Sequence, residues 1–225
     1  MEKKDFPKGT KPREIFVYTC ERIAEPLIPL GYKYRKSKND IYKKDGIFVF
    51  SFYFSPSICF GSTTFTAFFD VSSPVIAQWR SEQEGTEETY DGIVGTSIAR
   101  LTHRYDDFPR YEVSTLLERE RSIQEISGQI RDYALPFFAR FSDLPKLLDD
   151  VEREGFFPYR RGFDVPKRNR EFIECFPGVS EKDIINYSKK TKRRKAVWKK
   201  SESFYRNLRN IRTNFGKAML RSGWT

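Results

Sequence analysis

The stretch Ile47-Phe48-Val49-Phe50-Ser51-Phe52-Tyr53-Phe54 decides the fold of this 225-residue chain. It is rich in aromatic and β-branched residues, and its length suits a strand. The stretch 63–71, Thr63-Thr64-Phe65-Thr66-Ala67-Phe68-Phe69-Asp70-Val71, is its expected partner. In the stretch 47–54, seven of the eight residues are apolar, and successive side chains of a strand point to opposite faces. We therefore expect a central strand whose two faces are both covered by helices.

Further strands are predicted on both sides of this pair. Residues 32–35 alternate in polarity, and Asp45-Gly46 separates two β-prone runs, which is a strong hairpin signal. After the pair, residues 93–104 alternate well enough to form another strand.

Three helices are indicated by caps and periodicity. Pro12 opens an apolar stripe that Pro26, Pro29 and Gly31 should end. Thr115 and Glu118 form a capping box ahead of a long helix, with Gly128 and Pro136 as its expected points of interruption. A third helix should begin after Ser142-Asp143 and end at Gly155.

The order helix, strands, long helix, helix predicts an α+β fold with an antiparallel sheet packed by helices. Residues 75–83 fit either a short helix or an irregular cover, and residues 156–185 carry no assignable pattern. We predict an α+β domain over residues 1–185 and a basic helical extension over residues 186–225.

Composition indicates a soluble protein. Aromatic residues make up 16% and charged residues 32% of the chain, and the mean hydropathy is −0.65. The three cysteines, Cys20, Cys59 and Cys175, form no C-x-x-C pair, which favours a reducing compartment. The charged N-terminus lacks the apolar core of a signal peptide, and no run is long enough to span a membrane. We therefore expect a cytoplasmic location.

The net charge of +10 is concentrated at the C-terminus. Residues 186–225 hold thirteen lysines and arginines and one glutamate, for +12, which leaves −2 on the first 185 residues. An asymmetry of this size indicates a polyanionic partner.

The basic segment has the pattern of an amphipathic helix. At 100° per residue, Val197, Phe204, Leu208, Ile211, Phe215 and Met219 form one apolar stripe opposite the cations. Three interpretations remain open: the stripe docks and the cations are only solvated, the cations bind nucleic-acid phosphates, or the helix lies on an anionic membrane or in a partner's groove. Trp198, Tyr205 and Trp224 could stack on unpaired bases. The candidate nucleic-acid-binding residues are Lys189, Lys190, Lys192, Arg193, Arg194, Lys195, Trp198, Lys199, Arg206, Arg209, Lys217 and Arg221.

Several segments together resemble a bacterial family catalogued as domain of unknown function 4304. They are Leu30-Gly31-Tyr32-Lys33 after the opening helix, the hairpin over residues 41–53, and Tyr133-Ala134-Leu135-Pro136-Phe137-Phe138 with the leucines that follow. The resemblance covers residues 13–155 and implies an α+β fold. It implies no catalytic residues, and the basic segment lies outside it.

The residues leave few routes to catalysis. His103 is the only histidine, and it lies near a predicted strand end, where a structural role is expected. The cysteines lack zinc-ligand spacing, and the phosphate-loop, dinucleotide and nucleophile-elbow motifs are absent. We expect no metal and no cofactor. A magnesium-dependent nuclease stays open, with candidate carboxylates Asp70, Asp106, Asp107 and Glu112.

The sequence therefore favours a non-enzymatic protein that binds RNA or DNA phosphate backbones through its basic helix. The first alternative is a protein-binding adaptor or immunity-type module that uses the acidic loop over residues 82–91 or an aromatic surface. The metal-dependent nuclease is the second alternative.

Overall fold

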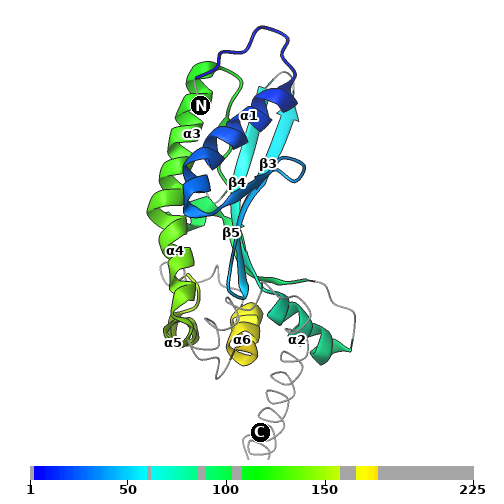
Figure 1. Cartoon of the computed structure of the whole chain (residues 1–225), viewed down its shortest axis with the longest axis vertical. Helices are drawn as coiled ribbons and strands as arrows, with labels where there is room; N and C mark the ends of the chain where they lie inside the picture. The colour runs from blue at the N-terminus through cyan, green and yellow to red at the C-terminus, as the bar shows by residue number, and fades with distance from the viewer. Residues whose placement is uncertain (1–2, 60–61, 86–89, 103–107, 158–165, 177–225) are drawn as a thin grey trace, which may run out of the picture. The chain divides into compact units, whose positions relative to one another are not determined.

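The protein is an α+β domain built on a six-stranded antiparallel sheet. The computed structural model describes residues 3–59, 62–85, 90–102, 108–157 and 166–176 (Figure 1). The strands are β1 (Lys33–Arg35), β2 (Asp40–Asp45), β3 (Phe48–Cys59), β4 (Ser62–Ser72), β5 (Gly92–Ser97) and β6 (Tyr111–Glu112). Neighbouring strands follow the order β1-β2-β3-β4-β5. Strand β6 also pairs with β4: it pairs with Thr64 and Phe65 in the first half of β4, whereas β5 pairs with residues 68–72 in the second half. The predicted fold class is confirmed.

Helices account for most of the remaining described chain. They are α1 (Pro12–Ala24), α2 (Pro74–Glu84), α3 (Leu116–Gln129), α4 (Leu135–Ala139), α5 (Leu144–Glu154) and α6 (Pro166–Cys175). Short 3-10 turns cover Glu25–Leu30, Ile98–Leu101 and Arg140–Ser142. Helix α2 settles the open choice at residues 75–83, and α6 lies in a region that carried no sequence assignment.

The structure confirms the turns and caps predicted at Gly31, Gly46, Thr115 and Asp143. Gly46 joins β2 to β3 with a φ of 56°, a left-handed value that glycine adopts without strain. Gly31 ends the first helical segment with a φ of 88°. Thr115 and Glu118 form the complete capping box of α3, and the Asp143 side chain caps α5.

Pro136 widens the long helix without ending it. Proline has no N–H, and its ring would clash with the carbonyl four residues earlier in a regular helix. A π-helical turn over Ile130–Ala134 absorbs this constraint, and the Leu135 N–H donates to the Ile130 carbonyl. Gly128 lies inside α3. The α-helical pattern is therefore interrupted between Gln129 and Leu135, close to the two expected positions, but the chain stays helical and runs on into α4.

Two strand predictions also need correction. The strand expected over residues 93–104 ends at Ser97, where a 3-10 turn begins. The expectation that both faces of residues 47–54 are covered is also wrong. Phe52 is fully buried, whereas its neighbour Tyr53 is 40% exposed. The reason is that alternate residues of β3 lie on opposite faces, and only the face that carries Phe48, Phe50, Phe52 and Phe54 is fully buried.

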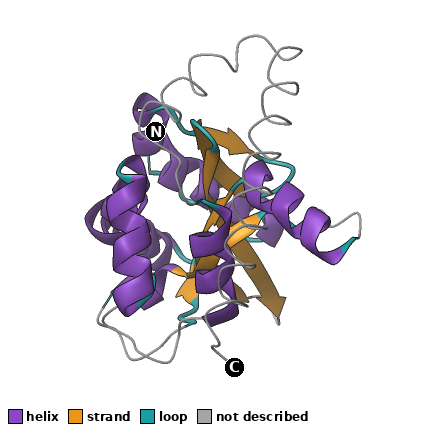
Figure 2. Ribbon diagram, turned by 90° about the horizontal axis from the view of Figure 1, so that it is seen from below, coloured by secondary structure: helices purple, strands orange, loops and turns teal. Residues whose placement is uncertain are grey.

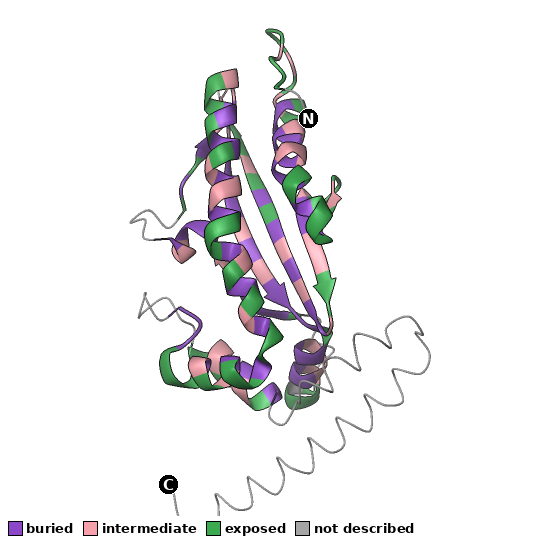
Figure 3. Cartoon of the chain, turned by 60° about the vertical axis from the view of Figure 1, so that its left-hand side comes forward, coloured by how far each residue is buried: buried purple, intermediate pink, exposed green. Residues whose placement is uncertain are grey.

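The buried face holds a core of phenylalanine rings. Phe138 of α4 contacts Phe50 and Phe52 of β3 at ring distances of 4.8 and 5.2 Å. Phe16 of α1 meets Phe65 of β4 at 6.0 Å. Figure 1 shows α1 lying across the strands, and Figure 2 shows the largest group of helices on one side of them. Along the strands in Figure 3, buried residues alternate with more exposed ones.

Candidate functional site

The predicted nucleic-acid-binding residues, Lys189 to Arg221, lie outside the residues that the structure describes. So do His103, Asp106 and Asp107, residues 86–89 of the predicted acidic loop 82–91, and the boundary expected at residue 185. Within the described residues, the half-exposed face of the sheet is the strongest candidate for a second contribution to binding.

We call this surface the open face. It is the side of the sheet that carries Val49, Ser51, Tyr53 and Ser55 of β3 and Thr64, Thr66, Phe68 and Asp70 of β4. Residues directly opposite each other in paired strands share a face. The register adds two residues of β2 to this face: Tyr42, which is opposite Ser51, and Lys44, which is opposite Val49. It also adds two residues of β1: Lys33, which is opposite Tyr42, and Arg35, which is opposite Asp40.

Three aromatic side chains form a strip across the open face. Tyr53 and Phe68 are direct cross-strand partners, and their rings stack at 4.7 Å with an interplanar angle of 3°. The Phe108 ring lies 6.2 Å from that of Phe68. Tyr53 is 40% exposed and Phe108 is 50% exposed. We refer to Tyr53, Phe68 and Phe108 as the aromatic strip.

Cationic side chains lie beside aromatic rings at two places around this face. The Arg35 guanidinium is 4.1 Å from the centre of the Tyr42 ring and is paired with Asp40. At the other side, the Arg100 guanidinium lies 5.2 Å from the Phe108 ring. In each case the guanidinium is attracted to the π-face of the ring, and the arginine keeps its positive charge.

Asp70 is the one open-face carboxylate with a strongly shifted pKa among the described residues. Burial and the neighbouring charge of Asp91 raise its pKa to about 6, against a smaller opposing effect of Arg168 on α6. Its Oδ1 lies 2.5 Å from where a Cβ on Gly95 would be, so the glycine makes room for the carboxylate. The shift makes Asp70 sensitive to mildly acidic pH.

Replacing Asp70 with asparagine is expected to change how stability depends on pH. The folded state binds the Asp70 proton more tightly than the unfolded state, whose reference pKa is 3.8. The free energy of unfolding should therefore fall as pH rises from about 4 through 6, by roughly 2–3 kcal/mol from this group. D70N should be more stable than the parent protein at pH 7 and should lose this slope. Urea unfolding between pH 4 and pH 8 measures it.

Asp149→Asn is the control, since Asp149 is an exposed aspartate on α5. Its stability curve should stay parallel to that of the parent protein. If the curve of unfolding free energy against pH for D70N is also parallel to that of the parent protein, Asp70 does not titrate in the way its surroundings indicate.

Glu112, another nuclease candidate, has a structural role. Burial opposes its charged form, but hydrogen bonds from the Ser114 and Ser62 side chains and from nearby backbone N–H groups hold its pKa below the usual range. These contacts join β6 to the start of β4. Across the described ranges, no three His, Cys, Asp or Glu side chains are grouped so as to hold a metal ion.

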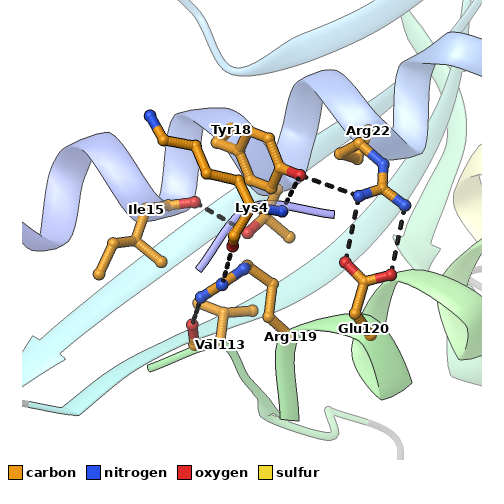
Figure 4. A network of polar contacts seen from close by, with 8 residues as sticks. Lys4, Ile15, Tyr18, Arg22, Val113, Arg119 and Glu120 are labelled. Atoms are coloured by element: carbon orange, nitrogen blue, oxygen red, sulfur yellow. Dashed lines mark hydrogen bonds and ion pairs between the residues drawn. The ribbon is translucent and has the colours of Figure 1, made fainter. Parts of the chain in front are cut away.

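The two buried cysteines and the fully buried Arg119 also serve the fold. Cys20 and Cys175 are buried, and burial raises the pKa of both thiols, while Cys59 is exposed. The fully buried Arg119 donates to the Val113 and Lys4 carbonyls, and Arg22 forms a two-bonded pair with Glu120 (Figure 4). This network fastens the N-terminal segment and α1 to α3.

The open face was missed in the sequence although a signal was present. In residues 48–55 every even position is phenylalanine, and the odd positions are Val49, Ser51, Tyr53 and Ser55. Counting apolar residues along the run obscured this difference between the two faces. A face-by-face reading identifies Tyr53 as an aromatic residue on the less apolar side.

These features define an α+β protein with one helix-packed sheet face and one aromatic-lined, half-exposed face. The chain belongs to the family described as Domain of unknown function (DUF4304), whose model matches residues 23–140. This confirms the resemblance seen in the sequence, within the expected range of 13–155. No curated protein and no solved structure shows a significant match to the chain. Within the described residues, each helix is too short or too polar to cross a bilayer.

Proposed function

We propose that the protein associates with nucleic acid, without catalysis, by binding phosphate backbones through residues 186–225. The observation that carries this proposal is the net charge of +12 in those residues, with Trp198, Tyr205 and Trp224 among the cations. Lysine and arginine that neutralise phosphates release condensed counterions, so this mode of binding needs no base readout. A cytoplasmic location and a bacterial source remain part of the proposal.

Neutralising part of the basic cluster is expected to weaken binding and to reduce its dependence on salt. The test variant carries Arg193→Gln, Arg194→Gln and Lys195→Gln. If all three contact phosphates of a single strand, the slope of log K against log salt should become shallower by about 2, and affinity should fall roughly 10- to 100-fold at 0.1 M salt. Fluorescence anisotropy with a labelled 20-nucleotide strand, over a series of salt concentrations, measures both quantities.

The matched control neutralises Lys8, Lys38 and Lys146, three exposed lysines of the folded domain. Both variants change the net charge by the same amount, so only the location of the charge differs. Equal losses in the two variants would mean that net charge alone drives association. Binding by the parent protein that is absent or insensitive to salt would contradict the proposal.

A second candidate function, a protein-binding module, is favoured by one observation. Ile28 and Leu30, in the turn after α1, are 57% and 49% exposed. Exposed apolar side chains close together are common at protein interfaces. Recovery of one stoichiometric protein partner from the native host, resistant to nuclease and lost in an Ile28→Ser, Leu30→Ser variant, would favour this function over the first.

A further inference from the structure

We infer that the open face binds the bases of single-stranded nucleic acid, with the aromatic strip as its stacking surface. This inference rests on the proposed function and deepens it, because it names the class of nucleic acid. The cations of the basic segment would bind single strands and duplexes alike through their phosphates. The open face adds a surface that only unpaired bases can reach.

The first argument is the exposure of large aromatic side chains on a sheet. Tyr53 and Phe108 keep 40% and 50% of their surface exposed, although each lies close to Phe68. Such rings could have been buried on the opposite face, where phenylalanine occupies the four alternate positions 48, 50, 52 and 54 of β3. Aromatic side chains on an accessible sheet are a recurrent means of stacking unpaired bases, and they tolerate any sequence because every base has a π-face.

The second argument is the distribution of charge around the strip. Lys33, Arg35 and Lys44 lie on β1 and β2, at one side of the aromatic strip, and Arg100 lies beside Phe108 at the other. Bases stacked on the strip would therefore have cations on two sides for their phosphates. Two carboxylates share this surface: Asp40 is paired with Arg35, and Asp70, whose pKa is raised to about 6, is partly protonated only in mildly acidic solution.

The third argument comes from the polar residues that surround the strip. Ser55 and Thr66 are paired beside Tyr53 and Phe68, and Ser51 lies on the other side of Tyr53. Hydroxyl groups both donate and accept hydrogen bonds, so they can meet the edges of any base. The open face thus combines ring stacking, nearby cations and adaptable polar groups, which is the composition of a sequence-tolerant single-strand site.

The test uses the full chain and three probes of one sequence: labelled 20-nucleotide single-stranded DNA, the same strand as RNA, and the DNA duplex. Tyr53→Ala and Phe108→Ala should each lower single-strand affinity about tenfold, with duplex affinity and the salt slope unchanged. Leu117→Ala is the matched control, because Leu117 is an exposed apolar residue of α3, at 81%. The DNA and RNA arms determine which single strand binds more tightly.

A second measurement does not depend on the variants folding well. Single strands that contain 5-iodouracil crosslink under ultraviolet light to aromatic side chains in contact with the base. Peptide mapping of the parent protein should place crosslinks at Tyr53, Phe68 or Phe108. Crosslinks that map only to residues 186–225 would overturn the inference.

The outcomes separate this inference from the proposed function. If the parent protein binds with a salt-dependent affinity that R193Q/R194Q/K195Q weakens, while Y53A and F108A behave like L117A, the tail binds nucleic acid and the open face does not. If no probe binds, both proposals are wrong. A concentration-dependent dimer that Y53A abolishes, without any change in single-strand binding, would assign the open face to a second copy of the chain and overturn the inference.

Discussion

Replacing Phe69 with alanine is expected to lower the free energy of unfolding by about 4 kcal/mol. Phe69 is fully buried in β4, and its ring contacts those of Phe137, Phe138 and Phe157 at 5.2, 6.0 and 6.4 Å. Alanine would remove the buried area and leave a cavity that the surrounding rings fill only in part. Chemical denaturation monitored by tryptophan fluorescence and circular dichroism measures the loss, which is a large share of the stability of a domain this size.

Phe68→Ala is the internal control, because the same residue type is removed one position earlier in the same strand. Phe68 lies on the open face, half-buried against Tyr53. Its loss removes one stacked ring pair and little core, so we expect about 1 kcal/mol. Similar losses for the two variants would mean that both faces of β4 are equally buried, contrary to the structure.

Replacing Glu171 with glutamine is expected to destabilise the protein by about 3 kcal/mol. Glu171 of α6 accepts hydrogen bonds from the Arg80 Nε and Nη2 of α2 at 2.9 and 2.6 Å. The side chains are only 7% exposed for Arg80 and 14% for Glu171. Removing the carboxylate charge leaves a buried guanidinium without its counter-charge, which costs more than the pair contributes. Urea unfolding at pH 7 gives the size of the effect.

Two further variants distinguish a buried ion pair from general damage to α6. Lys167→Gln removes the exposed lysine 3.8 Å from the other Glu171 oxygen and should cost less than 0.5 kcal/mol. Replacing both Arg80 and Glu171 with methionine should recover part of the E171Q loss, because no unpaired charge remains buried. The recovery should be only partial, because the Tyr90 and Gly92 carbonyls lose the Arg80 donor in the double variant. A double variant that is less stable than E171Q would contradict this account.

Local signals predicted most of the fold. The proline at residue 12, the glycines at 31 and 46, the capping box at Thr115 and the cap at Asp143 all mark element boundaries in the structure. Each depends on the chemistry of one to four adjacent residues, which the sequence displays directly. The predictions differ from the structure at places where tertiary contacts determine the local conformation. A π-turn accommodates Pro136 and keeps the chain helical, and strand β5 stops at Ser97, short of the expected end at residue 104.

The candidate site was likewise predictable from the sequence only in part. The charge of residues 186–225 and the aromatic composition of residues 48–55 can be counted in the sequence. The aromatic strip could not be assembled from it, because Phe108 reaches Phe68 across forty residues of chain. The pKa of Asp70 likewise depends on Asp91 and Arg168, which come from distant segments.

The sequence by itself determined that this chain forms an antiparallel sheet with helices and carries a concentrated positive charge, because alternation, caps and charge are local properties. Only the tertiary structure decided which side of that sheet is covered. Exposure is set by where α1, α3 and α4 pack, and that packing depends on contacts between residues far apart in the chain. The same long-range packing leaves Tyr53 and Phe108 accessible and buries Phe52 and Phe69.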